Sequence, residues 1–179
     1  MNPAPNLVLV GPMGAGKTSI GKRLAGHFEL VFADSDRAVE THTGAKVATI
    51  FDCEGEVGFR ARESATLAAL LAGEGLVAAT GGGAVLDPEN RRLMRQRGFV
   101  VHLHVGLAEQ LERLSRDRAR PLIARADRQD VLRQLAIVRE PLYAEVADLR
   151  FDTTGLAPGE AAARLGRLLD ERWQRGVAA

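Results

Sequence analysis

Short runs of apolar residues recur along the chain, and their length predicts buried strands. The runs occupy residues 7–10, 30–33, 76–79, 99–105 and 149–151. An apolar run of this length without polar alternation is typical of a strand that is covered on both faces, as in a parallel sheet. We therefore expect five strands, the first ending where a glycine-rich segment begins at Gly11.

The segments between these runs predict helices because they are rich in alanine and leucine. We place helices at residues 63–72, 88–96, 107–114, 130–146 and 158–173. Asp87 before Pro88 fits an N-cap followed by proline at the first helical position, and Pro158 with Glu160 has the same character. Strands that alternate with helices predict a three-layer α/β/α protein around a five-stranded parallel sheet.

One segment interrupts this alternation. Residues 115–128 are dense in arginine and lack an apolar period. We interpret the segment as an insert over a site, because long loops within a compact domain are usually functional, often as active-site lids. No repeat or linker divides the 179 residues, so we expect a single domain over residues 1–179.

Composition and charge limit the classes of partner. The 24 basic and 23 acidic residues leave a net charge of +1, which gives no reason to expect nucleic acid or an acidic membrane as a partner. The first apolar run is too short to cross a bilayer, and no basic segment precedes it. The single Cys53 has no partner for an internal disulfide, and we expect it to be buried. These features favour a cytoplasmic protein.

The strongest motif is GPMGAGKT at residues 11–18, which matches G-x-x-x-x-G-K-[ST] between a predicted strand and a helix. Glycines at 11, 14 and 16 allow backbone N–H groups to surround a phosphate. Lys17 is then expected to reach the β- and γ-phosphates, and the Thr18 hydroxyl to bind Mg²⁺. The alternative is a glycine turn without function. The motif leaves the reaction open, because GTPases, motor ATPases and kinases share it.

Two carboxylates, Asp34 and Asp36, follow the second predicted strand. In an extended chain they would share one face, near the strand end where open α/β sheets bind ligands. A kinase needs one carboxylate near Mg²⁺ and another to orient or deprotonate the acceptor hydroxyl. The strand at 76–79 is not followed by aspartate, so Asp34 is the candidate for the metal side. The same Asp-Ser-Asp pattern is also typical of a helix N-cap.

Two further motifs are candidates for the acceptor side. Arg60 and Glu63 lie three residues apart, so a helix would place them on one face, where the pair could hold the guanidinium for a carboxylate ligand. An ordinary surface ion pair has the same spacing, and Arg62 is an equally suitable arginine. Three glycines at 81–83 follow the strand at 76–79, which indicates close approach of backbone to a ligand or, alternatively, a loose turn.

In their order along the chain, these motifs resemble those of the shikimate kinases. The matching motifs are GPMGAGKT, DSD at 34–36, FRARE at 59–63, TGGG at 80–83, RPL at 120–122 and R-x-x-x-Y at 139–143. The resemblance implies a P-loop kinase of the nucleoside-monophosphate-kinase-like branch. It also implies a substrate-binding region at about 35–63, a lid at about 115–127, and transfer of the ATP γ-phosphoryl group to the 3-hydroxyl of shikimate. The products would be shikimate 3-phosphate and ADP, in the route to chorismate and aromatic amino acids.

The resemblance also implies a role for individual residues. The catalytic residues would be Lys17, Asp36 and Arg120, and the Mg²⁺ ligands Thr18 and Asp34. The nucleotide, with ATP as co-substrate, would contact Gly11, Gly14, Ala15, Gly16, Lys17, Thr18, Ser19, Arg113, Arg120, Thr153 and Pro158. Shikimate would contact Asp36, Phe51, Phe59, Arg60, Glu63, Gly81, Gly82, Gly83 and Arg139. The expected partners are shikimate and ATP alone, without nucleic acid or membrane, and the expected state is a monomer.

Two other functions fit part of the pattern. A gluconate kinase would share the phosphate-binding loop and the lid but should lack FRARE together with TGGG. A nucleotide switch without catalysis would have no need of an acceptor carboxylate such as Asp36. His102 and His104 alternate along a predicted strand without nearby cysteine or acidic residues in the sequence, so we expect them to pack rather than bind metal.

Overall fold

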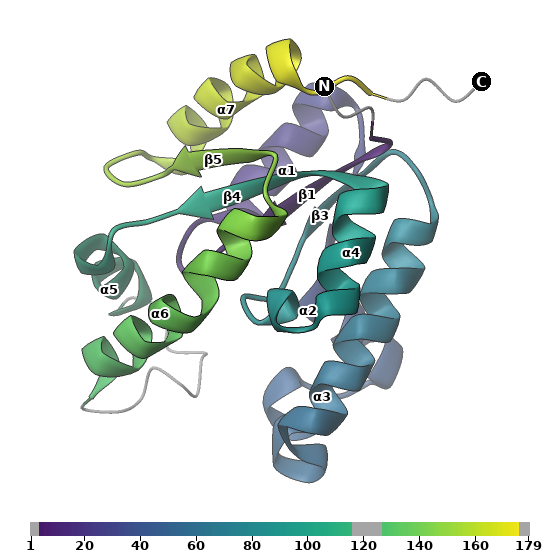
Figure 1. Cartoon of the computed structure of the whole chain (residues 1–179), viewed down its shortest axis with the longest axis vertical. Helices are drawn as coiled ribbons and strands as arrows, with labels where there is room; N and C mark the ends of the chain where they lie inside the picture. Colours follow the sequence, from purple (N-terminus) through teal and green to yellow (C-terminus); the bar gives the residue numbers. More distant parts are fainter. Residues whose placement is uncertain (1–3, 116–126, 176–179) are drawn as a thin grey trace.

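The computed structural model of the chain describes residues 4–115 and 127–175 (Figure 1). Its strands form one parallel sheet in the order β2-β3-β1-β4-β5, so β1 lies at the centre. Each expected strand is present, with its ends shifted by no more than a residue or two, because a buried apolar run marks a strand clearly. The strands are β1 (Asn6–Val10), β2 (Val31–Asp34), β3 (Leu76–Ala79), β4 (Gly98–His104) and β5 (Leu149–Asp152).

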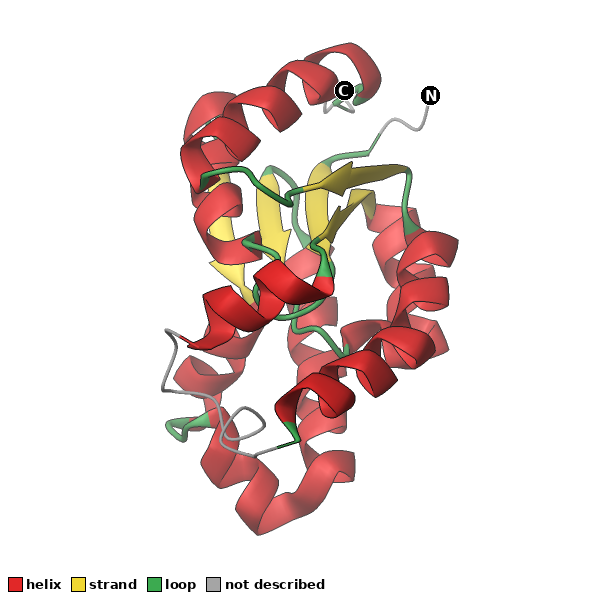
Figure 2. Ribbon diagram, turned by 90° about the vertical axis from the view of Figure 1, so that its left-hand side faces the viewer, coloured by secondary structure: helices red, strands yellow, loops and turns green. Residues whose placement is uncertain are grey.

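Helices cover both faces of the sheet (Figure 2). They are α1 (Lys17–Phe28), α2 (Ser35–Thr43), α3 (Val47–Ala72), α4 (Pro88–Arg97), α5 (Leu107–Ser115), α6 (Arg128–Val146) and α7 (Pro158–Arg172), with a short 3₁₀ helix η1 at Ala84–Leu86. Asp87 caps α4 by accepting from the Glu89 N–H at 2.8 Å, and Pro88 occupies the first turn, as predicted.

The alternation of side chains along β1 separates two apolar clusters. Leu7 and Leu9 pack in the cluster that α1 and α7 complete, whereas Val8 and Val10 pack in the cluster that α3, α4 and α6 complete. All four side chains are fully buried. A strand buried on both faces is the centre of a layered α/β fold, so the predicted three-layer α/β/α architecture is confirmed.

The helices between β2 and β3 differ most from the prediction. α2 was anticipated only through the alternative of an N-cap at residues 34–36. α3 begins well before residue 63 and contains a kink at Gly55, whose φ is +69°. This part of the chain packs around a small cluster of Val39, Ile50 and Phe59, so most of its surface is polar and exposed. The expectation that Cys53 is buried is wrong, because the side chain lies on the exposed part of α3.

The carboxyl ends of the strands meet at one edge of the sheet. β1 leads into the glycine-rich loop at residues 11–16, β2 ends at Asp34, β3 leads into residues 80–83, and β5 is followed by residues 153–157. The glycine-rich loop, Asp34 and the glycine turn at 80–83 therefore gather where open α/β sheets bind their ligands. Among the described helices, none combines the length and the apolar character that crossing a membrane requires.

Candidate active site

The loop between β1 and α1 has the geometry of a phosphate cradle. Gly11, Gly14 and Gly16 have φ values of +142°, +81° and +92°, which side chains other than glycine rarely adopt. A Cβ on Gly11 would also overlap the carbonyl oxygen of Leu103 on β4. Gly16 precedes α1 without a side-chain cap, and the first turn carries no acidic residue. The N–H groups at this helix start are therefore suited to an anion.

Other residues of the motif support this loop. Ala15 is fully buried and its N–H donates to Pro12 O at 3.3 Å, while Ser19 is exposed on α1. The Lys17 ammonium donates to the carbonyl oxygens of Gly11 and Pro12 at 2.7 and 2.8 Å. The charge of Lys17 is thus held directly over the loop.

Asp34 joins the loop to α2 through its two oxygens. Oδ2 accepts from the Thr18 hydroxyl at 2.7 Å, and Oδ1 accepts from the N–H groups of Asp36 at 3.1 Å and Arg37 at 3.3 Å. Asp34 is therefore the N-cap of α2, the alternative considered for this pattern. Asp36 lies in the first turn of α2, so the expectation that both carboxylates lie on one face of an extended chain is wrong. The adjacent Thr18 and Asp34 oxygens are the donor type that Mg²⁺ prefers.

The three consecutive glycines after β3 make room for the polar groups around them. A Cβ on Gly81 would lie 2.5 Å from Glu63 Oε1 and 2.8 Å from Asp36 Oδ1. A Cβ on Gly83 would lie 2.5 Å from Arg60 Nη1. The turn is also fixed in place, because the Gly81 N–H donates to Ser35 Oγ at 2.9 Å. A loose turn is therefore excluded, and the glycines are explained by close packing.

Gly82 lies between the two sides of the site. A Cβ at this position would be 3.4 Å from Arg139 Nη1 and 3.6 Å from the carbonyl oxygen of Gly11. The phosphate-binding loop, the glycine turn and Arg139 of α6 are thus neighbours, although they are far apart in the sequence.

Arg60 rather than Arg62 is the partner of Glu63. Arg60 Nη1 donates to Glu63 Oε2 at 2.6 Å, whereas Arg62 pairs with Glu54 on the exposed face of α3. Glu63 is 1% exposed, and burial raises the pKa of its carboxyl while the Arg60 guanidinium opposes the rise. Arg60 also contacts Glu56 at 3.3 Å. Because two carboxylates hold it, the guanidinium has a fixed direction.

Sequence reasoning did not assign a role to Tyr143, although it belongs to the quoted R-x-x-x-Y motif. Its side chain is buried, and its hydroxyl donates to Gly82 O at 2.5 Å. Burial raises the pKa of Tyr143 to about 12, so the hydroxyl stays a donor at neutral pH. Its spacing of four residues from Arg139 was the available signal. Tyr143 fixes the glycine turn to α6.

The two predicted aromatic residues differ in exposure. Phe59 is buried in the small cluster beside α2, and Phe51 is 36% exposed. Their ring centroids are 4.6 Å apart, and the Arg60 guanidinium lies 5.3 Å from the Phe59 ring centroid. Together they form the apolar side of the region around Arg60.

Arg113 connects the phosphate-binding loop with the loop after β5. It donates to Gly14 O at 3.1 Å, to Thr153 O at 2.9 Å and to Thr153 Oγ1 at 3.2 Å. Thr153 is buried, and Pro158 opens α7. An open pocket adjoins them and is lined by residues that include Gly106, Glu109, Arg113, Thr154, Leu156 and Ala157. The predicted lid arginine, Arg120, lies outside the described residues.

Comparison with known proteins identifies the family. The family model described as shikimate kinase matches residues 13–170. The chain belongs to the shikimate kinase family. A shikimate kinase of Stenotrophomonas maltophilia strain R551-3 is 56% identical over 175 residues, covering 98% of this chain and 97% of the relative. One of Xanthomonas oryzae pv. oryzae strain PXO99A is 53% identical over 178 residues, covering 99% of each chain.

A solved shikimate kinase has the same fold. The enzyme of Acinetobacter baumannii in complex with shikimate superposes with a TM-score of 0.90 and is 44% identical, with 95% of each chain covered. The predicted P-loop kinase fold and the predicted resemblance to shikimate kinases are therefore confirmed.

Proposed function

We propose that the site described above is the active site of an ATP-dependent kinase that phosphorylates the 3-hydroxyl of shikimate, giving shikimate 3-phosphate and ADP. Membership of the shikimate kinase family supports the reaction. We further propose that the enzyme acts as a monomeric single domain in the cytoplasm, with residues 35–63 on the substrate side and residues 115–127 as a lid that includes Arg120.

The observation that carries the proposal is the packing around the glycine turn. A Cβ on Gly81 would meet Asp36 and Glu63, one on Gly83 would meet Arg60, and one on Gly82 would meet Arg139 and the phosphate-binding loop. An acid and two guanidinium groups thus surround one small turn next to the phosphate-binding loop, which supports the proposal. A carboxylated polyol needs both kinds of group, because its charge binds arginine and its reacting hydroxyl needs a carboxylate.

On the nucleotide side, the backbone N–H groups of the loop bind the phosphates, and Lys17 exchanges its loop carbonyls for the β- and γ-phosphate oxygens. Thr18 and Asp34 would hold Mg²⁺, which neutralises charge that develops on the phosphates. Arg113 lines the pocket that would receive the adenine, and Thr153 and Pro158 flank the lining residues 154–157 in the sequence. Arg120 of the lid would reach the phosphates after closure.

On the acceptor side, Arg60 and Arg139 bind the carboxylate of shikimate and so orient its ring. Glu63 holds Arg60, and Phe51 with Phe59 supplies an apolar wall. Asp36 accepts a hydrogen bond from the reacting hydroxyl and aligns it with the γ-phosphate. Transfer proceeds through a loose transition state, so positioning and charge neutralisation provide most of the rate enhancement.

The proposal is tested by ADP release in a coupled assay with shikimate, quinate and gluconate as acceptors. We expect Mg²⁺-dependent turnover with shikimate. We expect little with gluconate, because its hydroxyls are on an open chain and not on a ring. Lys17→Ala and Asp36→Asn should each reduce kcat by at least about a hundred-fold, because each removes a group that contacts the reacting phosphate or hydroxyl. Ordinary turnover by Asp36→Asn would remove that residue from the mechanism.

Two neighbouring arginines provide a matched pair for acceptor recognition. Arg60→Ala should raise the KM for shikimate at least about ten-fold and leave the KM for ATP unchanged, since it removes a charge-assisted bond to the acceptor alone. Arg62→Ala is the control, because Arg62 pairs with Glu54 and is exposed. Equal effects of the two changes would contradict carboxylate recognition by Arg60.

A further inference from the structure

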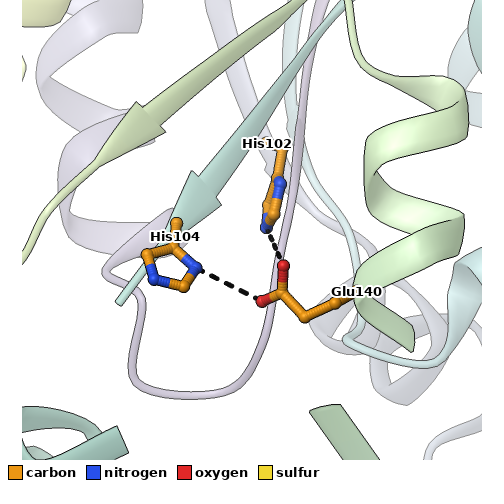
Figure 3. Close-up of side chains that lie close together, drawn as sticks. All are labelled: His102, His104 and Glu140. Carbon is orange, nitrogen blue, oxygen red and sulfur yellow. Dashed lines mark hydrogen bonds and ion pairs between the residues drawn. The ribbon is translucent and has the colours of Figure 1, made fainter. Parts of the chain in front are cut away.

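His102, His104 and Glu140 form a cluster beside the proposed active site (Figure 3). The two histidines are two residues apart on β4, so both project from the sheet face that α6 covers. Glu140 projects from α6, and its carboxylate lies between the two imidazole rings. Glu140 on α6 is far in sequence from the two histidines on β4. The expectation that the histidines only pack therefore did not take its carboxylate into account.

The buried imidazole of His102 is the unusual member of the cluster. Its side chain is 1% exposed, yet within the described part of the chain neither ring nitrogen has a hydrogen-bond partner. A buried polar group without a hydrogen bond is costly, and each such group requires an explanation. Burial also lowers the pKa of His102 to about 4, so the ring is neutral at physiological pH and keeps the lone pair that binds metal.

The three side chains converge on one point. Glu140 Oε1 is 3.3 Å from His104 Nδ1, and Glu140 Oε2 is 3.7 Å from His102 Nε2. One donor atom from each residue lies within 4.8 Å of the others. Donors of a tetrahedral zinc ion, each about 2.0–2.2 Å from the metal, are separated by a little over 3 Å, so small side-chain movements would close the cluster.

We propose that His102, His104 and Glu140 bind one divalent transition metal ion of the zinc type. Two imidazoles and a carboxylate are a ligand set typical of Zn²⁺ and its neighbours in the first row, whereas Mg²⁺ prefers oxygen donors. The site therefore differs in chemistry from the Thr18–Asp34 pair. His104 and Glu140 are 25% and 35% exposed, which gives the ion a path to the buried His102.

A metal ion at this position would link two elements of the fold. It would connect β4 directly to α6, the helix that carries Arg139 and Tyr143. The positive charges of Lys17 and Arg150 act on His102 and weaken the attraction for a cation, so we expect weaker binding than in a zinc site made of cysteines. The ion takes no part in phosphoryl transfer.

The test is a zinc titration of the full chain by isothermal titration calorimetry, after removal of any affinity tag and with excess Mg²⁺ in the buffer. We expect one equivalent of Zn²⁺ to bind to the unmodified protein. His104→Gln and Glu140→Gln should each weaken binding at least about ten-fold, because each removes a ligand. His42→Gln is the control, because His42 is an exposed histidine on α2 and should leave binding unchanged.

A second measurement identifies the ligands independently of affinity. Co²⁺ in a tetrahedral nitrogen and oxygen site absorbs visible light strongly, and we expect this absorption in the unmodified protein and in His42→Gln but not in Glu140→Gln. Circular dichroism verifies that each variant is folded. Absence of zinc binding to the unmodified protein, or full binding to His104→Gln, would overturn the proposal. Neither outcome depends on kinase activity, so the proposed function is tested separately.

Discussion

Glu63 is a buried carboxylate that pairs with Arg60. One of its oxygens holds Arg60 at 2.6 Å, and the other lies against Gly81. Burial of a charged group is costly unless a partner of opposite charge compensates. Here the partner is Arg60, which we propose binds the carboxylate of shikimate. The charge of Glu63 is therefore tied to the direction of the Arg60 guanidinium.

Replacement of Glu63 by glutamine tests this coupling. Glu63→Gln keeps the shape of the side chain but removes the charge, so Arg60 loses its strongest anchor. We expect the KM for shikimate to rise about ten-fold with little change in the KM for ATP, in line with the strength of a charge-assisted hydrogen bond. Glu56→Gln is the matched control, because Glu56 is 62% exposed and contacts Arg60 at 3.3 Å. An equal change in both variants would show that Glu63 has no special role.

The raised pKa of Glu63 also predicts how stability depends on pH. The folded protein keeps the proton on this carboxyl to a higher pH than the unfolded chain, whose value is near 4.5. The contribution of Glu63 to the free energy of unfolding is therefore complete below pH 4.5 and is lost as pH rises through the folded-state pKa.

Urea unfolding of the unmodified protein and of Glu63→Gln, at intervals from pH 4 to pH 7, measures this effect. Because glutamine does not titrate, we expect the unfolding free energy of the variant, relative to that of the unmodified protein, to increase across this range. A difference that is constant with pH would show that the pKa is not raised.

The turn after β3 acts as a unit, because each of its glycines leaves space for a different polar side chain. Gly83 has a φ of −98°, which alanine adopts without strain, so a substitution there changes space and little else. Tyr143 holds the same turn from α6. The turn thus determines how far apart the acid and the two arginines lie.

Gly83→Ala should displace Arg60, because the new Cβ would lie 2.5 Å from Nη1. We expect the KM for shikimate to rise at least about ten-fold, as for loss of a positioned guanidinium. Gly26→Ala is the control: apart from its chain neighbours and the backbone of its own helix, nothing lies within 4 Å of its added Cβ. Alanine in helix α1 should stabilise the protein by about 0.5–1 kcal/mol. Steady-state kinetics with thermal unfolding of both variants distinguishes local displacement from general damage.

The elements that could be predicted from sequence are those with a strong local cause. The buried runs of β1 and β3 and the Asp87-Pro88 helix start depend on neighbouring residues alone. The extent of α3 could not be predicted, because its first half packs on α2 through few apolar residues and is otherwise polar.

The kinds of residue at the candidate site could be predicted from the sequence, but which of them contact one another could not. The choice between Arg60 and Arg62 depended on which side of α3 faces the sheet, and the cluster of His102 with Glu140 depended on how α6 lies across β4. Both are long-range contacts, which spacing along the chain does not determine. Residue type and order indicated the chemistry, and only the fold showed which groups meet.

The whole chain packs around two apolar clusters that share the central sheet. Leu165 belongs to the cluster on the α7 face and Leu67 to the cluster on the α3 face, and both are fully buried. Because β1 contributes alternate residues to each cluster, neither can lose its packing without affecting the other. A single cooperative unit follows from this arrangement.

Two core substitutions test that conclusion. Leu67→Ala and Leu165→Ala should each lower the free energy of unfolding by about 3 kcal/mol, the usual cost of such a cavity. Trp173, the only tryptophan, is buried in the α7-side cluster and reports on that face. We expect Leu67→Ala to shift the Trp173 fluorescence transition in urea as far as the transition in far-ultraviolet circular dichroism. Different midpoints for the two signals would mean that the faces unfold separately.

The double use of Asp34 has a consequence for repeated turnover. Oδ1 keeps the start of α2 in place whichever partner Oδ2 has, be it the Thr18 hydroxyl or a metal ion. In the proposed mechanism, each nucleotide can thus arrive and leave while Asp36 stays where we expect the next acceptor to bind. We then expect the acceptor side to need no rebuilding between cycles, so that no reorganisation cost of this kind adds to the barrier.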